Sequence, residues 1–239
     1  MNKRGLSHIE IILGFVLFAS AIFFIFYFFD VGKVNKDNES IGIYVFNQIK
    51  KNISTEVISY SVKINPFVLS SDKKVAIELN EEIPNDFKLR AENYTGEKLP
   101  AKRDNIDRKK VYVDLKEDLD YVRLLFCKDI DSQEGNFQNP TLIPGAYEIV
   151  SREDYSVISQ KKAEELKGLY DAQYSILKKS FAVPNKINFG FELIFSDTEF
   201  IKAENATPLR AEVYSKITRS EVIKSNGERV FADYGVKVW

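Results

Sequence analysis

An almost unbroken apolar run from Ile11 to Phe29, closed by Asp30, dominates the hydropathy pattern of this chain. As a helix this run would be roughly 28 Å long, close to the hydrocarbon thickness of a bilayer, about 30 Å. A helix that is apolar on every side needs apolar surroundings all round. The pattern therefore predicts a transmembrane helix over residues 6–30, with the lipid bilayer as its partner.

The flanking charges predict how this helix is oriented. Lys3 and Arg4 precede the run, and no further Lys or Arg occurs until Lys33. Positive charge is retained on the cytoplasmic side, so we expect a single-pass protein of the cell membrane with a cytoplasmic N-terminus and an extracellular C-terminal domain. A cleaved secretory signal peptide is the alternative, because residues 19–21 (Ala-Ser-Ala) resemble its cleavage site. Cleavage there would leave residues 22–29 as a bare apolar N-terminus, which favours a retained helix.

Beyond the apolar run, hydrophobic and polar residues alternate in many short segments, a pattern typical of strands with one buried face. The pair Asn226-Gly227 separates two further segments, 221–224 and 229–239. Asn-Gly is favoured in tight hairpin turns because both residues tolerate positive φ, so we expect a terminal hairpin. The other alternating segments are 58–64, 75–79, 87–91, 111–115, 122–126, 189–195 and 209–213.

Two segments have helical rather than strand periodicity. Residues 40–51 place Ile41, Val45 and Ile49 four residues apart, which predicts a short helix docked on the strands. Residues 159–180 combine an apolar stripe with a charged opposite face, as expected of a surface helix packed on a sheet. The stripe consists of Ala163, Leu166, Tyr170, Tyr174, Leu177 and Phe181. We therefore expect an α+β fold, with the transmembrane helix followed by a β-rich extracellular head that contains one long amphipathic helix.

The chain of 239 residues is long enough for one substantial domain or two small ones after the apolar run. Residues 29–38 are polar and include Gly32, so we expect the membrane helix to stop or kink there. The glycine- and proline-containing stretch 128–145 reads as a loop between two halves of the head. The predicted organisation is a leader over 1–5, a membrane helix over 6–30, a linker and short helix over 31–54, and an extracellular domain over 55–239.

The first thirty residues resemble the class III signal peptide of type IV pilin-like proteins, particularly archaeal ones. The resemblance rests on the pair Lys3-Arg4, on Gly5 and on Glu10 ahead of the apolar helix. It implies that a prepilin peptidase cleaves after Gly5 and leaves Leu6 as the new N-terminus. It also implies that Glu10 meets the freed amine of a neighbouring subunit during assembly. Such an ion pair is physically sound, because it removes two uncompensated charges from lipid.

A second interpretation of Glu10 is a solvated acid at the membrane interface, close to Arg4. The interruption at 29–38 and the large head both depart from a simple pilus subunit. They fit a minor pilin-like protein, or a protein that uses the leader only for secretion and anchoring.

The remaining sequence offers little catalytic chemistry. A net charge of −1 and a pI near 6.0 give no nucleic-acid signature. One histidine, His8, and one cysteine, Cys127, exclude a histidine-based triad in the head and a zinc site built from several Cys or His. Residues 129–135 are better explained as a polar turn than as a calcium loop, because the glycine comes one place late. We expect no cofactor, no metal and no enzymatic activity.

Four N-glycosylation sequons occur on the side predicted to be extracellular, at Asn38, Asn52, Asn93 and Asn205. Together these features predict a membrane-anchored, extracellular, pilin-like or surface-assembly subunit, with other pilin-like subunits as partners. The alternative is a signal-anchored extracellular binding module that does not assemble into filaments.

Overall fold

The computed structural model describes residues 4–69, 73–117, 119–131, 135–205 and 212–239, without the side chains of 4–9 and 27–38. Within these residues, strands outnumber helices by twelve to two. The fold is mostly β, so the predicted α+β class is wrong. The helices are α1 (Arg4–Ile53) and α2 (Gln160–Ser180). The strands are β1 (Ser54–Ile64), β2 (Lys74–Glu78), β3 (Lys88–Asn93), β4 (Lys98–Leu99), β5 (Ala101–Arg103), β6 (Lys110–Asp114), β7 (Tyr121–Cys127), β8 (Tyr147–Ser159), β9 (Phe189–Ile194), β10 (Phe200–Ala203), β11 (Tyr214–Ile223) and β12 (Arg229–Val238).

The class prediction failed because most of the strands belong to one large curled sheet. Nine strands form it in the order β10-β9-β12-β11-β8-β1-β7-β3-β4, and a second sheet has the order β2-β6-β5. Strands β8 and β11 are joined only where Val222 pairs with Ile158 and Ile223 pairs with Ser159, in parallel. The large sheet is therefore narrowly connected at its middle, and its two halves build separate cores.

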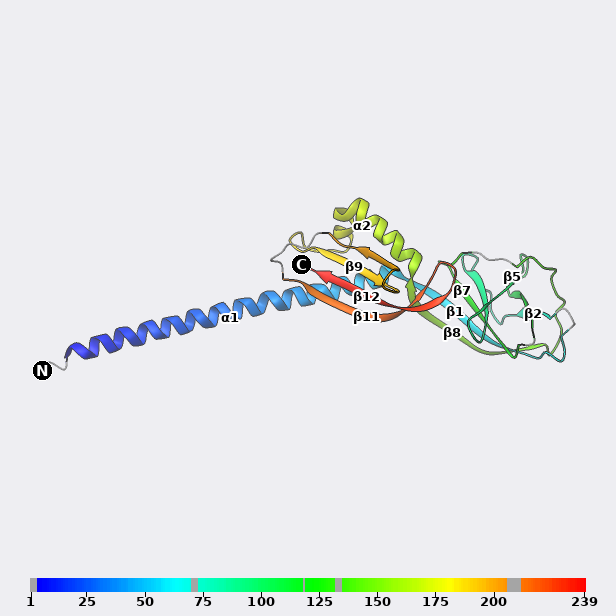
Figure 1. Ribbon diagram of the computed structural model, residues 1–239, viewed down its shortest axis with the longest axis horizontal. Helices are drawn as coiled ribbons and strands as arrows, with labels where there is room; N and C mark the ends of the chain where they lie inside the picture. Colours follow the sequence, from blue (N-terminus) through cyan, green and yellow to red (C-terminus); the bar gives the residue numbers. More distant parts are fainter. Residues whose placement is uncertain (1–3, 70–72, 118, 132–134, 206–211) are drawn as a thin grey trace.

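One core lies between α1, α2 and the β9–β12 half of the sheet, and the other lies between the β1–β7–β3 half and the small sheet. In Figure 1 the small sheet, with β2 and β5, lies at the end of the molecule opposite to the N-terminus of α1. A smaller cluster, including Val57, Leu125 and Ile223, connects the two halves.

Helix α1 is continuous over 50 residues, and its N-terminal part projects away from the sheets (Figure 1). The predicted stop or kink within 29–38 is wrong, as is the prediction of a separate helix beginning near residue 40. A glycine inside a helix costs only about 1 kcal/mol relative to alanine. Gly32 alone is therefore too weak a break between two strongly helical segments.

Among the residues that the structure describes, no helix contains a stretch long and apolar enough to cross a membrane. This finding contradicts the predicted transmembrane helix over 6–30. It equally contradicts the predicted single-pass localisation in the cell membrane, with a cytoplasmic N-terminus and an extracellular C-terminal domain.

The C-terminal end of α1 is held firmly against the β9–β12 half of the sheet. Val45 and Ile49 are buried in that core, as their four-residue spacing with Ile41 predicts, and Phe46 is buried beside them. The buried Tyr234 hydroxyl donates a hydrogen bond of 2.9 Å to the Phe46 carbonyl oxygen. This contact fixes the last turns of α1 to β12, although the two residues are far apart in sequence.

Helix α2 confirms the predicted amphipathic helix. Ser159 caps its N-terminus by accepting a hydrogen bond from the Lys162 backbone N–H at 3.2 Å. Its apolar stripe faces the core, where the Tyr170 hydroxyl donates to the Phe189 carbonyl oxygen at 2.6 Å. The stripe residues Ala163, Leu166, Tyr170 and Leu177 are buried.

Most of the strands predicted from alternation are confirmed. The terminal hairpin is also confirmed as β11 and β12, and Gly227 in its turn has the positive φ of +81° that favours glycine. The predicted segment 209–213 lies mostly outside the described residues, and β11 begins at Tyr214. Strands β4, β5, β8 and β10 were not predicted.

A titratable turn closes the small sheet after β5. The Asp104 carboxylate accepts hydrogen bonds from the Tyr112 hydroxyl at 2.5 Å and from the backbone N–H groups of Ile106 and Asp107 at 2.8 Å each. These bonds, the Tyr112 bond above all, lower the pKa of Asp104 to about 2.

Because the folded pKa of Asp104 lies below the unfolded value of about 3.9, its stabilisation is complete above that value and is lost as the pH falls towards 2. We expect Asp104→Asn to flatten the decline in urea midpoint between about pH 4 and 2. Urea titrations at several pH values, read by circular dichroism, measure this. An Asp104→Asn profile parallel to that of the unmodified chain would disprove the assignment.

Candidate functional site

The most unusual surface of the molecule is the N-terminal part of α1. We call residues 11–26 the apolar segment. Phe15, Leu17 and Phe23 are 70%, 64% and 75% exposed. The other large exposed side chains of the segment are Ile11, Ile12, Leu13, Val16, Phe18, Phe24, Ile25 and Phe26.

These side chains surround the helix instead of forming one stripe. Consecutive residues on an α-helix point about 100° apart, so the run from Phe15 to Phe18 alone covers every side. Each of those four side chains is more than half exposed. A helix of a soluble protein normally buries one face and exposes a polar one. Extended apolar surface of this kind marks a site of interaction.

The residues of the predicted leader lie at the start of the same helix. Arg4, Gly5 and Leu6 belong to the first turns of α1, whereas Lys3 lies outside the described residues. Glu10 is exposed and directly precedes the apolar segment. The structure therefore places an acid beside the apolar surface, but cleavage after Gly5 and pairing of Glu10 with a neighbouring amine stay predictions.

The four sequons lie in different environments. Asn52 is exposed in the last turn of α1, and Asn205 is exposed after β10. Asn93 is only 5% exposed, and its side-chain oxygen accepts a hydrogen bond from the Thr95 backbone N–H at 3.0 Å. The turn would have to open before a glycan could be attached to Asn93. The side chain of Asn38 is outside the described part of α1.

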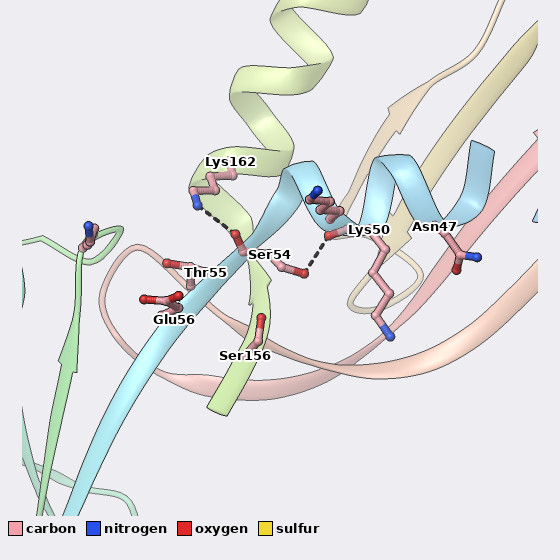
Figure 2. A pocket seen from close by; sticks show the side chains of 9 residues that line it. Asn47, Lys50, Ser54, Thr55, Glu56, Ser156 and Lys162 are labelled. Atoms are coloured by element: carbon pink, nitrogen blue, oxygen red, sulfur yellow. Dashed lines mark hydrogen bonds between the residues drawn. The ribbon is translucent and has the colours of Figure 1, made fainter. Parts of the chain in front are cut away.

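A second feature is a pocket of about 600 Å³ where the C-terminal end of α1 meets the sheet. Figure 2 shows Asn47 and Lys50 on α1, Lys162 on α2, and Thr55 and Glu56 on β1 around this space. Every residue of the lining is polar or charged, with four lysines against one acid. It consists of Asn47, Lys50, Lys51, Ser54, Thr55, Glu56, Lys128, Ser156 and Lys162.

Two of the four lysines have carboxylate partners at the margin of the pocket. The Lys162 ammonium donates to the Ser54 carbonyl oxygen at 2.7 Å and lies 3.5 Å from the Asp129 carboxylate. The Lys128 ammonium lies 2.7 Å from the Asp86 carboxylate. The sequence did not single out these lysines, because each is unremarkable by itself and only the fold brings them together.

The structure gives little support for a metal site or a reactive cysteine. Within the described ranges, no group of three or more His, Cys, Asp or Glu side chains is placed to hold a metal ion. Cys127 is fully buried, and burial raises the pKa of its thiol, which keeps it in the unreactive protonated form. The single cysteine therefore acts as a small core residue beside Thr55.

Comparison with known proteins adds no relative. No protein-family model, curated protein or solved structure matches the chain. The resemblance of the N-terminus to pilin-like leaders therefore has no family match to support it. The function has to be argued from the two surface features described above.

Proposed function

We propose that this chain is a non-enzymatic, pilin-like assembly subunit that associates with other copies through the apolar segment of α1. The observation that carries the proposal is the exposure of large apolar side chains on every side of this helix. Copies of the same helix, packed together, would cover these side chains and present the sheets outward.

The energetics favour such packing. Burying one large apolar side chain contributes about 1.5–3 kcal/mol, so even a few buried per copy give substantial driving force. Gly14, within the apolar segment, has no side chain and so allows a second helix to approach closely. Helices pack at interaxial distances of about 8–10 Å, and small residues at the contact allow the shorter end of that range.

The continuity of α1 adds further support. The apolar segment and the docked residues Val45 and Ile49 belong to one 50-residue helix, so an assembly of α1 helices would hold the heads in a defined position. The pilin-like resemblance supplies the finer part of the proposal. In that part, a prepilin peptidase cleaves after Gly5, and Glu10 pairs with the amine at Leu6 of a neighbouring copy.

Cysteine crosslinking of the full-length chain tests this assembly. Single cysteines at each of positions 15–18 sample every side of α1, and Cys127 does not interfere because it is fully buried. Disulfides form only when Cβ atoms come within about 4.5 Å. We expect at least one of the four variants to give disulfide-linked dimers on mild oxidation, whereas Ser215→Cys, on the exposed surface of β11, forms no disulfide-linked dimer. Failure of all four variants, or equal crosslinking at Ser215, would rule the assembly out.

A further inference from the structure

The lysine-lined pocket at the end of α1 has an excess of positive charge that the neighbouring acids do not fully neutralise. Its four lysines and one glutamate leave a formal charge of +3 in the lining. Counting the partners of Lys162 and Lys128, Asp129 and Asp86, the balance is still +1. The whole chain, by contrast, has a net charge of −1.

The position of Lys162 makes its positive charge additionally unfavourable in the absence of a bound anion. It lies in the first turn of α2, where the helix dipole disfavours a cation, and that turn contains no acidic residue. An anion in the pocket would offset both the dipole and the ammonium. By contrast, Lys50 and Lys51 are well placed for helix stability, because they lie in the last turn of α1.

The other residues of the lining supply uncharged hydrogen-bonding groups. Ser54 uses its hydroxyl proton to donate to the Lys50 carbonyl oxygen at 2.6 Å, so its oxygen remains an acceptor. Asn47 and Ser156 contribute an amide and a hydroxyl from α1 and β8. The volume of about 600 Å³ falls in the range of small-ligand sites and exceeds what one phosphate group would fill.

We propose that this pocket binds a small phosphorylated sugar or polyol. The lysines would neutralise its phosphate groups, for which lysine serves as a point-charge donor. The hydroxyl and amide groups of the lining would hydrogen-bond to the polyol. This site shares no residue with the apolar segment of α1, so its test is independent of the test of the assembly proposed above.

Isothermal titration of the full chain with fructose 1,6-bisphosphate at low ionic strength tests the site. We expect one equivalent to bind, more tightly than inorganic phosphate and with no binding of unphosphorylated fructose. The double variant Lys51→Gln/Lys128→Gln should weaken binding by about tenfold for each lysine removed. The variant Lys167→Gln/Lys186→Gln changes the net charge equally outside the lining and should leave the affinity unchanged.

A further variant, which removes a negative charge instead of positive ones, tests the site even if the lysine variants are destabilised. Among the described residues Glu56 is the only acid of the lining, so Glu56→Gln should tighten bisphosphate binding severalfold. Absence of binding by the unmodified chain, equal weakening in the charge-matched control, or weaker binding by Glu56→Gln would each overturn the assignment. Equally tight binding of inorganic phosphate would show that no polyol is recognised.

Discussion

Replacing Glu92 by glutamine should destabilise the head by about 3–5 kcal/mol, the cost typical of removing one partner from a buried ion pair. Glu92 lies on β3, and its side chain is only 3% exposed. Its carboxylate lies 3.0 Å from the Arg229 guanidinium and 3.4 Å from those of Arg90 and Arg123. Glutamine preserves the shape of this side chain but leaves three guanidinium groups without their shared counter-charge.

The network has a structural role because it joins the two halves of the large sheet. Arg123 lies on β7 directly opposite Glu92, whereas Arg229 begins β12 in the other half of the sheet. Arg90 also donates to the Asn226 carbonyl oxygen in the β11–β12 turn at 2.8 Å. The carboxylate therefore ties the terminal hairpin to β3 and β7, across the point where the large sheet is narrowly connected.

Urea unfolding followed by circular dichroism measures this loss of stability. Glu153→Gln is the matched control, since Glu153 is an exposed acid of β8, and surface changes of this kind usually stay within about 0.5 kcal/mol. A double-mutant cycle with Arg229→Gln should be strongly non-additive, because the two side chains touch. An effect of Glu92→Gln as small as that of Glu153→Gln would refute the role of the network.

Local sequence patterns predicted those elements that are specified by the hydrophobic alternation or the turn residues within the element itself. Alternation found β1, β7 and β9, and Asn226-Gly227 found the terminal hairpin. The pattern failed for β8, which contains Arg152, Glu153 and Asp154 in succession. Before Val157 no residue of β8 is fully buried, and its inward-facing Tyr147 and Ile149 are only half-buried. A weakly buried face that is followed by three charged residues gives only a weak alternating signal.

The errors at the N-terminus have a different cause. Gly32 and its polar neighbours predicted a break, yet helix formation is cooperative, so two strong helical segments can carry a short weak one between them. The apolar run looked sufficient for a membrane span when counted by sequence to Phe29. Among the described residues no helix meets that requirement.

The lysine-lined pocket could not be predicted from the sequence, because only the fold brings its residues together. Lys50, Lys128 and Lys162 come from α1, the end of β7 and α2, and no spacing rule relates them. The same holds for Glu92 and Arg229, which meet only through the curl of the sheet. By contrast, the apolar segment was visible from sequence, since its signal is simply consecutive apolar residues.

The apolar segment allows the second prediction of large effect. Changing Leu17 and Phe23 together to aspartate should convert an associating full-length chain into a monomer. The two residues are six positions apart and so lie on different sides of α1, where they affect contacts with more than one neighbour. Each loses the roughly 1.5–3 kcal/mol that burial would contribute and adds a charge that packing would have to desolvate.

Sedimentation velocity of the full-length chain distinguishes assembly through α1 from general stickiness. The control Phe67→Asp/Ile106→Asp removes two head side chains that are 97% and 94% exposed, with the same change in charge. This control should associate like the unmodified chain, because its altered residues lie outside α1. Circular dichroism melts of the head should be unchanged in both variants, since all four side chains are more than half exposed. If the Leu17/Phe23 variant still sediments as an assembly, α1 is not the surface that joins the copies. The same conclusion follows if the Phe67/Ile106 control becomes monomeric to the same extent.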